Sequence, residues 1–190
     1  PGLAPARDSA GRAGSAAELN EALQLTGAAN LMGVGNELAN RITGNAGANM
    51  LSGGGGTDQL SGLDGADSLV GGADGDQLTG GAGADWFIFN APGEGTDRIM
   101  DFTPGVDEIG VFQGAFGNLA LGNLAAAHFV AQASSMATAA AGTPQFIYNT
   151  AAGLLLFDPD GAGGTAAARL ATLSGRPAIT VADIEVYALS

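Results

Sequence analysis

Four aspartates recur at a spacing of nine residues in the middle of the chain, and a glycine stands five residues before each of them. The pairs are Gly53 with Asp58, Gly62 with Asp67, Gly71 with Asp76, and Gly80 with Asp85. Aspartate carboxylates and the carbonyls of glycine-rich turns are hard oxygen ligands, which Ca²⁺ selects. One turn supplies fewer than the roughly six oxygens that Ca²⁺ needs. The spacing therefore predicts Ca²⁺ sites that are each shared between two turns.

These residues belong to a repeat, which must set their positions. Residues 41–85 divide without a gap into five nine-residue units: RITGNAGAN, MLSGGGGTD, QLSGLDGAD, SLVGGADGD and QLTGGAGAD. Position two is always Ile or Leu, position four is always Gly, and position nine is Asn49 and then the four aspartates. A weaker copy precedes them at residues 32–40, and the series ends in Trp86-Phe87-Ile88-Phe89. Such a period indicates a solenoid, in which each unit is a tight glycine turn followed by a short strand.

The way the units stack decides which turns share an ion. If alternate units lie on the same side, the turn Gly53 to Asp58 faces Gly71 to Asp76. The other side then pairs Gly62 to Asp67 with Gly80 to Asp85. The turn that ends at Asn49 also lies on that side, and we expect it to pair less well because its amide brings no charge.

The units resemble the nonapeptide repeats, G-G-x-G-x-D-x-U-x, of the RTX family of secreted bacterial proteins. The resemblance implies a parallel β-roll with several Ca²⁺ ions in its turns. It also implies carbonyl ligands at the first and third turn positions and a carboxylate at the sixth. The implied ligands are Gly53, Gly55 and Asp58; Gly62, Asp64 and Asp67; Gly71, Ala73 and Asp76; and Gly80, Ala82 and Asp85. Leu63 and Asp74 stand where the pattern has glycine, so we expect strain or weaker ions in their turns.

Two other interpretations of the glycine-rich stretch are weaker. A flexible linker has a similar composition, but it gives no reason for Leu and Asp to recur every nine residues. A phosphate-binding loop over GGGGTDQLSG would need a basic residue, whereas the chain contains no lysine and the surroundings are acidic.

The overall charge narrows the range of partners. The net charge is −13, from 19 acidic residues against six arginines, which argues against binding to nucleic acid or to an anionic membrane surface. Between Asp58 and Glu108 there are eleven acids and one base, Arg98. Without cations this segment repels itself, so we expect calcium to supply much of its stability. The chain has no cysteine, which excludes disulfides.

The sequence predicts an all-β chain in three segments. Residues 1–31 form a loose N-terminal segment, with either a capping helix from Ser15 to about Leu23 or irregular strands that hold Leu23, Leu25 and Leu31. Residues 32–89 form the parallel β-roll, and residues 90–190 form a β-rich cap. In the cap we expect short strands near Asp97 and Ile109, a hairpin of 145–149 with 154–158, a strand over 167–173, and a turn capped at Thr180 before a last strand over 184–189.

The start of the cap resembles the C-terminal region of serralysin-type proteases. The motifs are Trp86 to Phe89, Asp97-Arg-Ile-Met-Asp101-Phe102 and Gly105-Val-Asp-Glu-Ile109. The resemblance implies a further Ca²⁺ near Asp97 and Asp101, and the alternative is that these are solvated strand ends. It also implies that the uncleaved C-terminal segment is a signal for a type I secretion exporter.

The sequence gives little support for enzymatic chemistry. We expect a short Ala-rich helix from Asn123 to about Ala131 to carry His128, and no H-E-x-x-H or G-x-S-x-G motif is present. We therefore expect a non-enzymatic, secreted calcium-binding module, located outside the cell or at its surface, with calcium and an exporter as partners. The alternative is a structural subunit of an extracellular assembly, such as a surface layer, an adhesin or a membrane complex.

Overall fold

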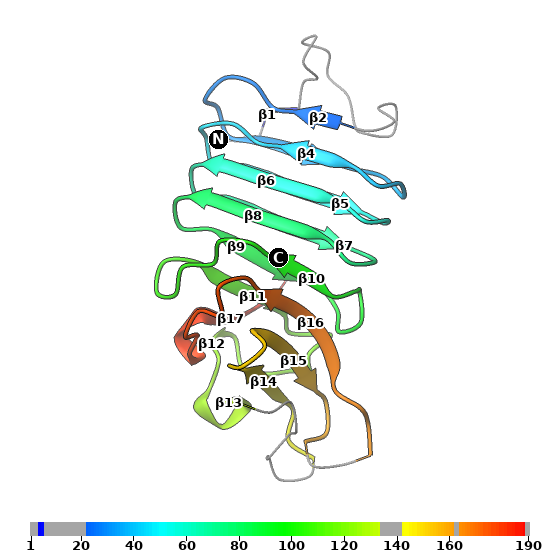
Figure 1. Ribbon diagram of the computed structural model, residues 1–190, viewed down its shortest axis with the longest axis vertical. Coiled ribbons are helices and arrows are strands. Elements are labelled where there is room, and N and C mark those ends of the chain that lie inside the picture. The colour runs from blue at the N-terminus through cyan, green and yellow to red at the C-terminus, as the bar shows by residue number, and fades with distance from the viewer. Residues whose placement is uncertain (1–3, 6–21, 134–141, 162–163, 189–190) are drawn as a thin grey trace.

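The computed structural model describes residues 4–5, 22–133, 142–161 and 164–188. The described chain is nearly all β-structure and is elongated along one axis (Figure 1). A stack of short, regular strands forms one end, and a smaller, less regular group of strands forms the other. The expected parallel β-roll followed by a β-rich cap is therefore confirmed.

Strands of the roll alternate between two parallel sheets as the chain winds. The first sheet contains β1 (Ala4–Pro5), β3 (Leu31–Val34), β5 (Met50–Gly54), β7 (Ser68–Gly72), β9 (Trp86–Phe89) and β11 (Glu108–Phe112). The second contains β2 (Ala22–Gln24), β4 (Arg41–Thr43), β6 (Gln59–Asp64), β8 (Gln77–Ala82) and β10 (Asp97–Ile99). Leu51 pairs with Leu69, and Leu60 pairs with Leu78. Two nine-residue units therefore make one complete turn of the solenoid.

A single line of apolar side chains from each sheet fills the space between the sheets. Position two of each repeat unit is at most 1% exposed, at Ile42, Leu51, Leu60, Leu69 and Leu78, and Phe87 continues this line. Full burial of one such side chain contributes roughly 1.5–3 kcal/mol. Because each unit buries only one large side chain, the core of the roll is thin.

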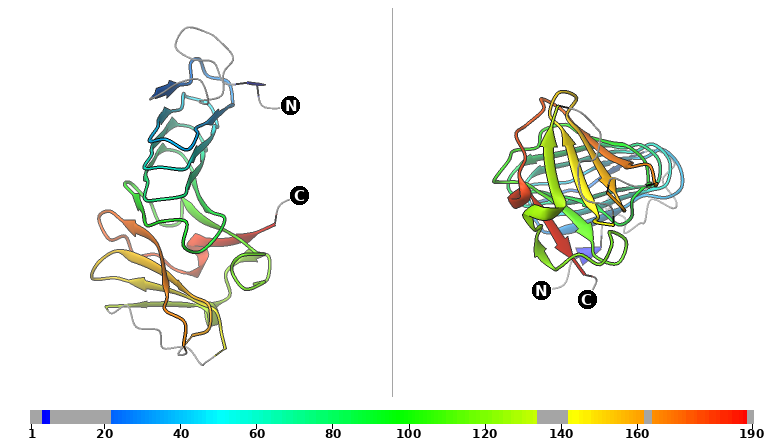
Figure 2. Two further views of the ribbon diagram at one scale, coloured as in Figure 1. Left: turned by 90° about the vertical axis from the view of Figure 1, so that its right-hand side faces the viewer. Right: turned by 90° about the horizontal axis from the view of Figure 1, so that it is seen from below.

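The cap extends both sheets of the roll without a break (Figure 2). In the first sheet, β17 (Ile184–Tyr187) pairs with β11, and β12 (Gly122–Asn123) pairs with β17. In the second sheet, β10 is followed by β16 (Ala168–Leu173), β15 (Leu154–Asp158), β14 (Gln145–Asn149) and β13 (Phe129–Gln132). Phe116, Phe146 and Phe157 pack against one another, with ring centroids 4.9–5.6 Å apart. The cap therefore has an aromatic core, which continues the apolar core of the roll.

Most expected elements of the cap are present. The hairpin of β14 and β15 is antiparallel as expected, and Thr180 caps the 3₁₀ turn η3 (Val181–Asp183) before β17. The expected helix around His128 is wrong: the structure has only the 3₁₀ turn η2 (Ala126–His128), because the following residues pair with β14 as β13. None of the helical segments in the described ranges is long and apolar enough to cross a membrane.

The N-terminal end of the roll contains strands. Leu23, Leu25 and Leu31 are buried, and β2 pairs with β4, so this end has the stacked strands that were one of the two alternatives. Most of the other alternative, a helix from Ser15, lies outside the described residues.

Candidate calcium-binding turns

The repeat aspartates stack in two columns, one along each edge of the roll. Asp58, Asp67, Asp76 and Asp85 are at most 2% exposed. In each case carboxylate Oδ1 accepts a hydrogen bond from the backbone N–H of the residue eighteen positions earlier, at 2.6–2.9 Å; the donors are Asn40, Asn49, Asp58 and Asp67. The first column is Asn40, Asp58, Asp76 and Asp97, and the second is Asn49, Asp67, Asp85 and Asp107. One oxygen of each carboxylate therefore fixes the register of adjacent turns.

The second oxygen of each repeat aspartate is unsatisfied. Oδ2 of Asp58, Asp67, Asp76 and Asp85 is buried and has no hydrogen-bond partner among the described residues. An unpaired buried carboxylate oxygen costs free energy, and the carboxyl group resists ionisation. Desolvation raises the pKa of Asp58 and of Asp67 from 3.8 to about 6, although the N–H groups of Asn40 and Asn49 act in the opposite direction. A cation beside Oδ2 would remove this penalty.

The glycines at the start of the turns leave space beside these oxygens. A Cβ atom on Gly53 would contact Asp58 Oδ2 and would lie 2.6 Å from the carbonyl oxygen of Gly71. A Cβ on Gly62 would likewise contact Asp67 Oδ2 and lie 2.6 Å from the Gly80 carbonyl oxygen. Each space is therefore bordered by a carboxylate oxygen of one turn and a carbonyl oxygen of the turn stacked on it. This set of donors fits the hard oxygen ligands of Ca²⁺.

Backbone carbonyls would have to supply most of the ligands. Among the described residues, no group of three or more acidic, histidine or cysteine side chains is placed to hold a metal ion. The residues at the third turn position lie in the same turns: Gly55 is buried, whereas Ala73, Ala82 and the side chain of Asp64 are exposed. Their carbonyls remain predicted ligands, and the exposed carboxylate of Asp64 lies outside the buried column.

The two residues that depart from the glycine pattern, Leu63 and Asp74, lie at positions where the backbone has a positive φ. Leu63 has φ 81° and Asp74 has φ 76°, where glycine occupies the equivalent positions of other turns. Positive φ is unfavourable for residues with a side chain, so the expected strain is present in both turns. Asp74 has partial compensation, because its Oδ2 accepts a hydrogen bond of 3.3 Å from the Gly56 N–H.

The two aspartates predicted after the repeats have different surroundings. Asp97 continues the first column: it is 4% exposed, and its Oδ1 accepts a hydrogen bond from the Asp76 N–H. Burial raises its pKa to about 7, with the charges of Asp76 and Glu94 adding to the effect. Asp101 lies outside both columns, and its two oxygens accept hydrogen bonds from the N–H groups of Gly80 and Gly81, at 3.0 and 2.9 Å.

Asp107, which the sequence analysis did not select, completes the second column. Its Oδ1 accepts from the Asp85 N–H at 3.1 Å and its Oδ2 from the Thr103 N–H at 2.7 Å, so both oxygens have backbone partners. It lies twenty-two residues after Asp85, which is not a multiple of nine, so the nine-residue period does not predict it. A different signal could have found it: it stands two residues before buried Ile109, just as Asp85 stands two residues before buried Phe87.

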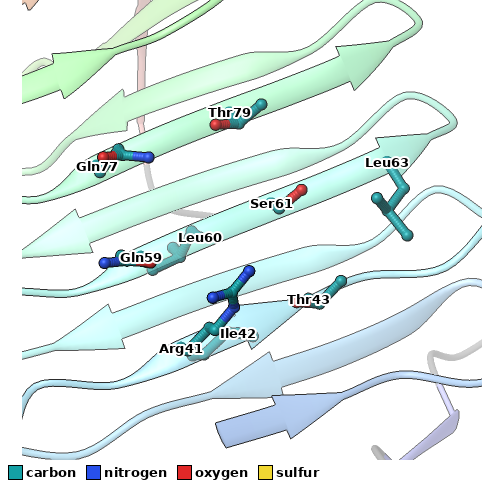
Figure 3. A pocket seen from close by; sticks show the side chains of 9 residues that line it. All are labelled: Arg41, Ile42, Thr43, Gln59, Leu60, Ser61, Leu63, Gln77 and Thr79. Atoms are coloured by element: carbon teal, nitrogen blue, oxygen red, sulfur yellow. The ribbon is translucent and has the colours of Figure 1, made fainter.

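A shallow groove lies on the outer face of β4, β6 and β8 and has a volume of about 260 Å³ (Figure 3). Two rows of polar side chains cross it: Arg41, Gln59 and Gln77 are in register, as are Thr43, Ser61 and Thr79. Leu63 lies at one end of the groove, beside the strained turn. The groove is separate from the buried aspartate columns.

One family model and one solved structure agree with this geometry. The family model of the RTX calcium-binding nonapeptide repeat matches residues 34–69 and 61–91. The solution structure of the AlgE6R3 subunit of the Azotobacter vinelandii mannuronan C5-epimerase is 31% identical, with a TM-score of 0.51, covering 80% of this chain and 80% of that chain. The AlgE6R2 subunit from the same organism is 28% identical, with a TM-score of 0.49, covering 84% of this chain and 93% of that chain. No curated protein matches the chain.

Proposed function

Because the chain belongs to the RTX family of calcium-binding nonapeptide-repeat proteins, we propose that it is a calcium-stabilised module in which ion binding and folding are one equilibrium. The observation that carries this proposal is the set of four buried carboxylate oxygens without partners, one in each aspartate turn. The ligands would be these oxygens together with carbonyls of the stacked turns. Bound Ca²⁺ would supply positive charge where the chain has buried only negative charge.

The magnitudes support a dominant role for calcium. A site saturated at a hundred times its Kd stabilises the folded chain by roughly 2.7 kcal/mol, and three such sites would give about 8 kcal/mol. That is comparable with the whole stability of a typical domain. The core of the roll is thin, with one large apolar side chain in each unit, so hydrophobic burial offsets little of the repulsion between its acidic side chains.

Native mass spectrometry of the purified protein in millimolar calcium tests this assignment directly. We expect several Ca²⁺ ions to be retained, and we expect the same concentration of magnesium to be a poor substitute because Mg²⁺ demands a tighter octahedral geometry. Retention of no calcium would contradict the proposal.

We further propose that the module works outside the cell and is exported by a type I system that reads its C-terminal segment. A chain that needs calcium would stay unfolded in a cytosol poor in the ion, and an unfolded chain can pass a narrow channel. Ile184 and Val186 are buried in the folded cap and β17 pairs with both β11 and β12, so an exporter could read this strand in an unpaired form only before folding.

Co-expression with a type I exporter tests the export proposal. Deletion of the residues after Asp183 should abolish export. Phe157→Asp, which breaks the aromatic core of the cap but leaves the C-terminal segment intact, should leave export unchanged because the chain is exported unfolded. Export of the truncated chain would contradict the signal assignment.

A second candidate function is that of an accessory subunit that holds a polysaccharide for a larger extracellular assembly. It is favoured by the polar groove and by the likeness to a subunit of an enzyme named for mannuronan. Arg41, Arg98 and Arg169 are all exposed on strands of the second sheet, although the chain as a whole is strongly acidic.

Polymannuronate should then bind the calcium-loaded protein and lose affinity in Arg41→Gln, whereas a neutral polymer should not bind. Equal binding of both polymers by the wild type and by Arg41→Gln would contradict this role. In this role the chain carries out no catalytic step.

A further inference from the structure

The two asparagine turns of the roll, Gly35 to Asn40 and Gly44 to Asn49, have a different backbone from the four turns that follow. In the aspartate turns the second and fourth positions all have positive φ: Gly54 and Gly56, Leu63 and Gly65, Gly72 and Asp74, Gly81 and Gly83. No residue from Gly35 to Asn49 has a positive φ. Because φ sets the direction of the neighbouring carbonyl groups, the two asparagine turns do not present the same oxygens as the aspartate turns.

Within the turn Gly44 to Asn49, two asparagine side chains satisfy each other and the backbone. Asn49 Oδ1 accepts a hydrogen bond of 2.7 Å from the Asn45 N–H, and Asn49 Nδ2 donates one of 3.0 Å to Asn45 Oδ1. Asn45 Oδ1 also accepts from the Gly47 N–H at 2.8 Å. The contrast with the aspartate turns is direct: Asn49 Oδ1 already has a donor, whereas Asp67 Oδ2, in the next turn of the same column, has none.

The Asn45 amide also bonds to the turn that contains Thr26 and Ala29, one full coil earlier in the solenoid. Asn45 Nδ2 donates to the carbonyl oxygen of Ala29 at 3.1 Å and to that of Thr26 at 3.4 Å. Both asparagines are buried, at 5% exposure for Asn45 and 3% for Asn49. An amide N–H₂ is a donor, so at this place it binds two carbonyl oxygens of the neighbouring turn, as a cation would. The turn therefore has no free anionic oxygen, and its amide already occupies the carbonyl oxygens of Ala29 and Thr26.

We propose that the turn Gly44 to Asn49 is closed by amides and takes no Ca²⁺, so that the calcium sites of the second column begin only at Gly62 to Asp67. This proposal rests on the proposed function, that the aspartate turns bind calcium, and it replaces the expectation that Asn49 is a weak ligand. The turn Gly35 to Asn40 has related bonds, since Asn36 N–H donates to Asn40 Oδ1 and Leu38 N–H to Asn36 Oδ1, both at 2.8 Å. The N-terminal end of the roll is thus held by uncharged hydrogen bonds, and its middle by ions.

The sequence offers a gain-of-function test. The double substitution Asn45→Gly with Asn49→Asp changes GNAGAN into GGAGAD, which is identical to residues 80–85. It removes the amide network, restores glycine at the second position and supplies a carboxylate beside the turn Gly62 to Asp67. We expect native mass spectrometry to find one more bound Ca²⁺ in the variant than in the wild type. The same number in both folded proteins would overturn the proposal, whereas no calcium in either would overturn the proposed function instead.

A single substitution keeps the proposal testable if the double variant fails to fold. In Asn49→Ala we expect the wild-type number of calcium ions and a lower melting temperature in saturating calcium, because only hydrogen bonds are lost. Asp67→Asn, its matched control in the next turn of the column, should lose an ion. Loss of an ion from Asn49→Ala as well would show that Asn49 is a ligand and would overturn the proposal.

Discussion

Each repeat aspartate divides its two carboxylate oxygens between two tasks. Oδ1 accepts a backbone N–H from the adjacent turn and so fixes how the turns stack, whereas Oδ2 is buried and unpaired. An asparagine side chain can also accept this N–H hydrogen bond, but it has no negative charge with which to bind a cation. This difference allows the structural role and the proposed metal-binding role of one residue to be separated by a single substitution.

Asp76→Asn should keep the hydrogen bond from the Asp58 N–H and lose one of the anionic candidate ligands of the first column. We expect calcium affinity to fall by about tenfold or more, which corresponds to ~1.4 kcal/mol. Calorimetric titration with calcium measures this. Asp101→Asn is the control, because Asp101 lies outside both columns and caps the N–H groups of Gly80 and Gly81. Equal losses in the two variants would mean that the buried column is not where calcium binds.

The raised pKa values predict that protonation of the buried aspartates at acidic pH stabilises the folded chain in part, as bound calcium does. The pKa is about 6 for Asp58 and Asp67 and about 7 for Asp97, against 3.8 for an ordinary aspartate, and desolvation is the main cause. Between about pH 4 and pH 7 the folded, calcium-free chain therefore binds more protons than the unfolded chain, so its stability falls as pH rises through this window. Far-UV circular dichroism of calcium-depleted protein should therefore show more β-structure near pH 5 than near pH 7.5.

Calcium binding should show the opposite dependence on pH. A carboxyl with a pKa of about 6 is mostly protonated at pH 5, so calcium must displace a proton there, and affinity should fall by about tenfold for each such ligand. Calcium affinity that does not change between pH 5 and pH 7 would contradict the assignment of these carboxylates as ligands.

At the scale of the elements, the turns differ in the strain that they carry. Leu63 has φ 81° and is 44% exposed, so its side chain gains little from burial to offset the unfavourable backbone. Asp74, at φ 76°, retains the hydrogen bond from the Gly56 N–H. The strained positions are therefore not equivalent.

Leu63→Gly should stabilise the calcium-loaded protein by about 0.5–1 kcal/mol, because relief of the left-handed strain exceeds the entropy cost of glycine. Thermal melting in saturating calcium measures this. Asp74→Gly should give a smaller gain, since it also removes a hydrogen bond. If Leu63→Gly lowers the melting temperature more than Asp74→Gly does, strain at position 63 does not limit the stability of the roll.

The regular elements could be predicted from sequence because each has a local signal. The nine-residue period located every strand from β4 to β9, and the apolar runs on both sides of a turn located the hairpin of β14 and β15. Pairings between distant segments gave no such signal: β10 pairs with β16, which lies more than seventy residues further along the chain. Asp107 was missed because longer loops break the period, and the amide network of Asn45 and Asn49 depends on side-chain orientation, which composition does not reveal.

At the scale of the whole molecule, three kinds of stabilisation follow one another along the axis. Amide hydrogen bonds hold the N-terminal turns, the aspartate columns hold the middle of the roll, and the aromatic core of Phe116, Phe146 and Phe157 holds the cap (Figure 1). Both sheets run continuously from roll to cap, so loss of the middle would separate the two ends. Calcium is therefore expected to control the integrity of the whole molecule.

Far-UV circular dichroism at neutral pH, in chelator and then in increasing calcium, tests this central claim most directly. The account predicts that most of the β-structure signal is absent in chelator and returns in a cooperative transition as calcium approaches the range of about 0.1–1 mM that is common for extracellular modules. Magnesium at the same concentration should not produce the transition. A full β-structure spectrum in chelator, unchanged by calcium, would contradict the account.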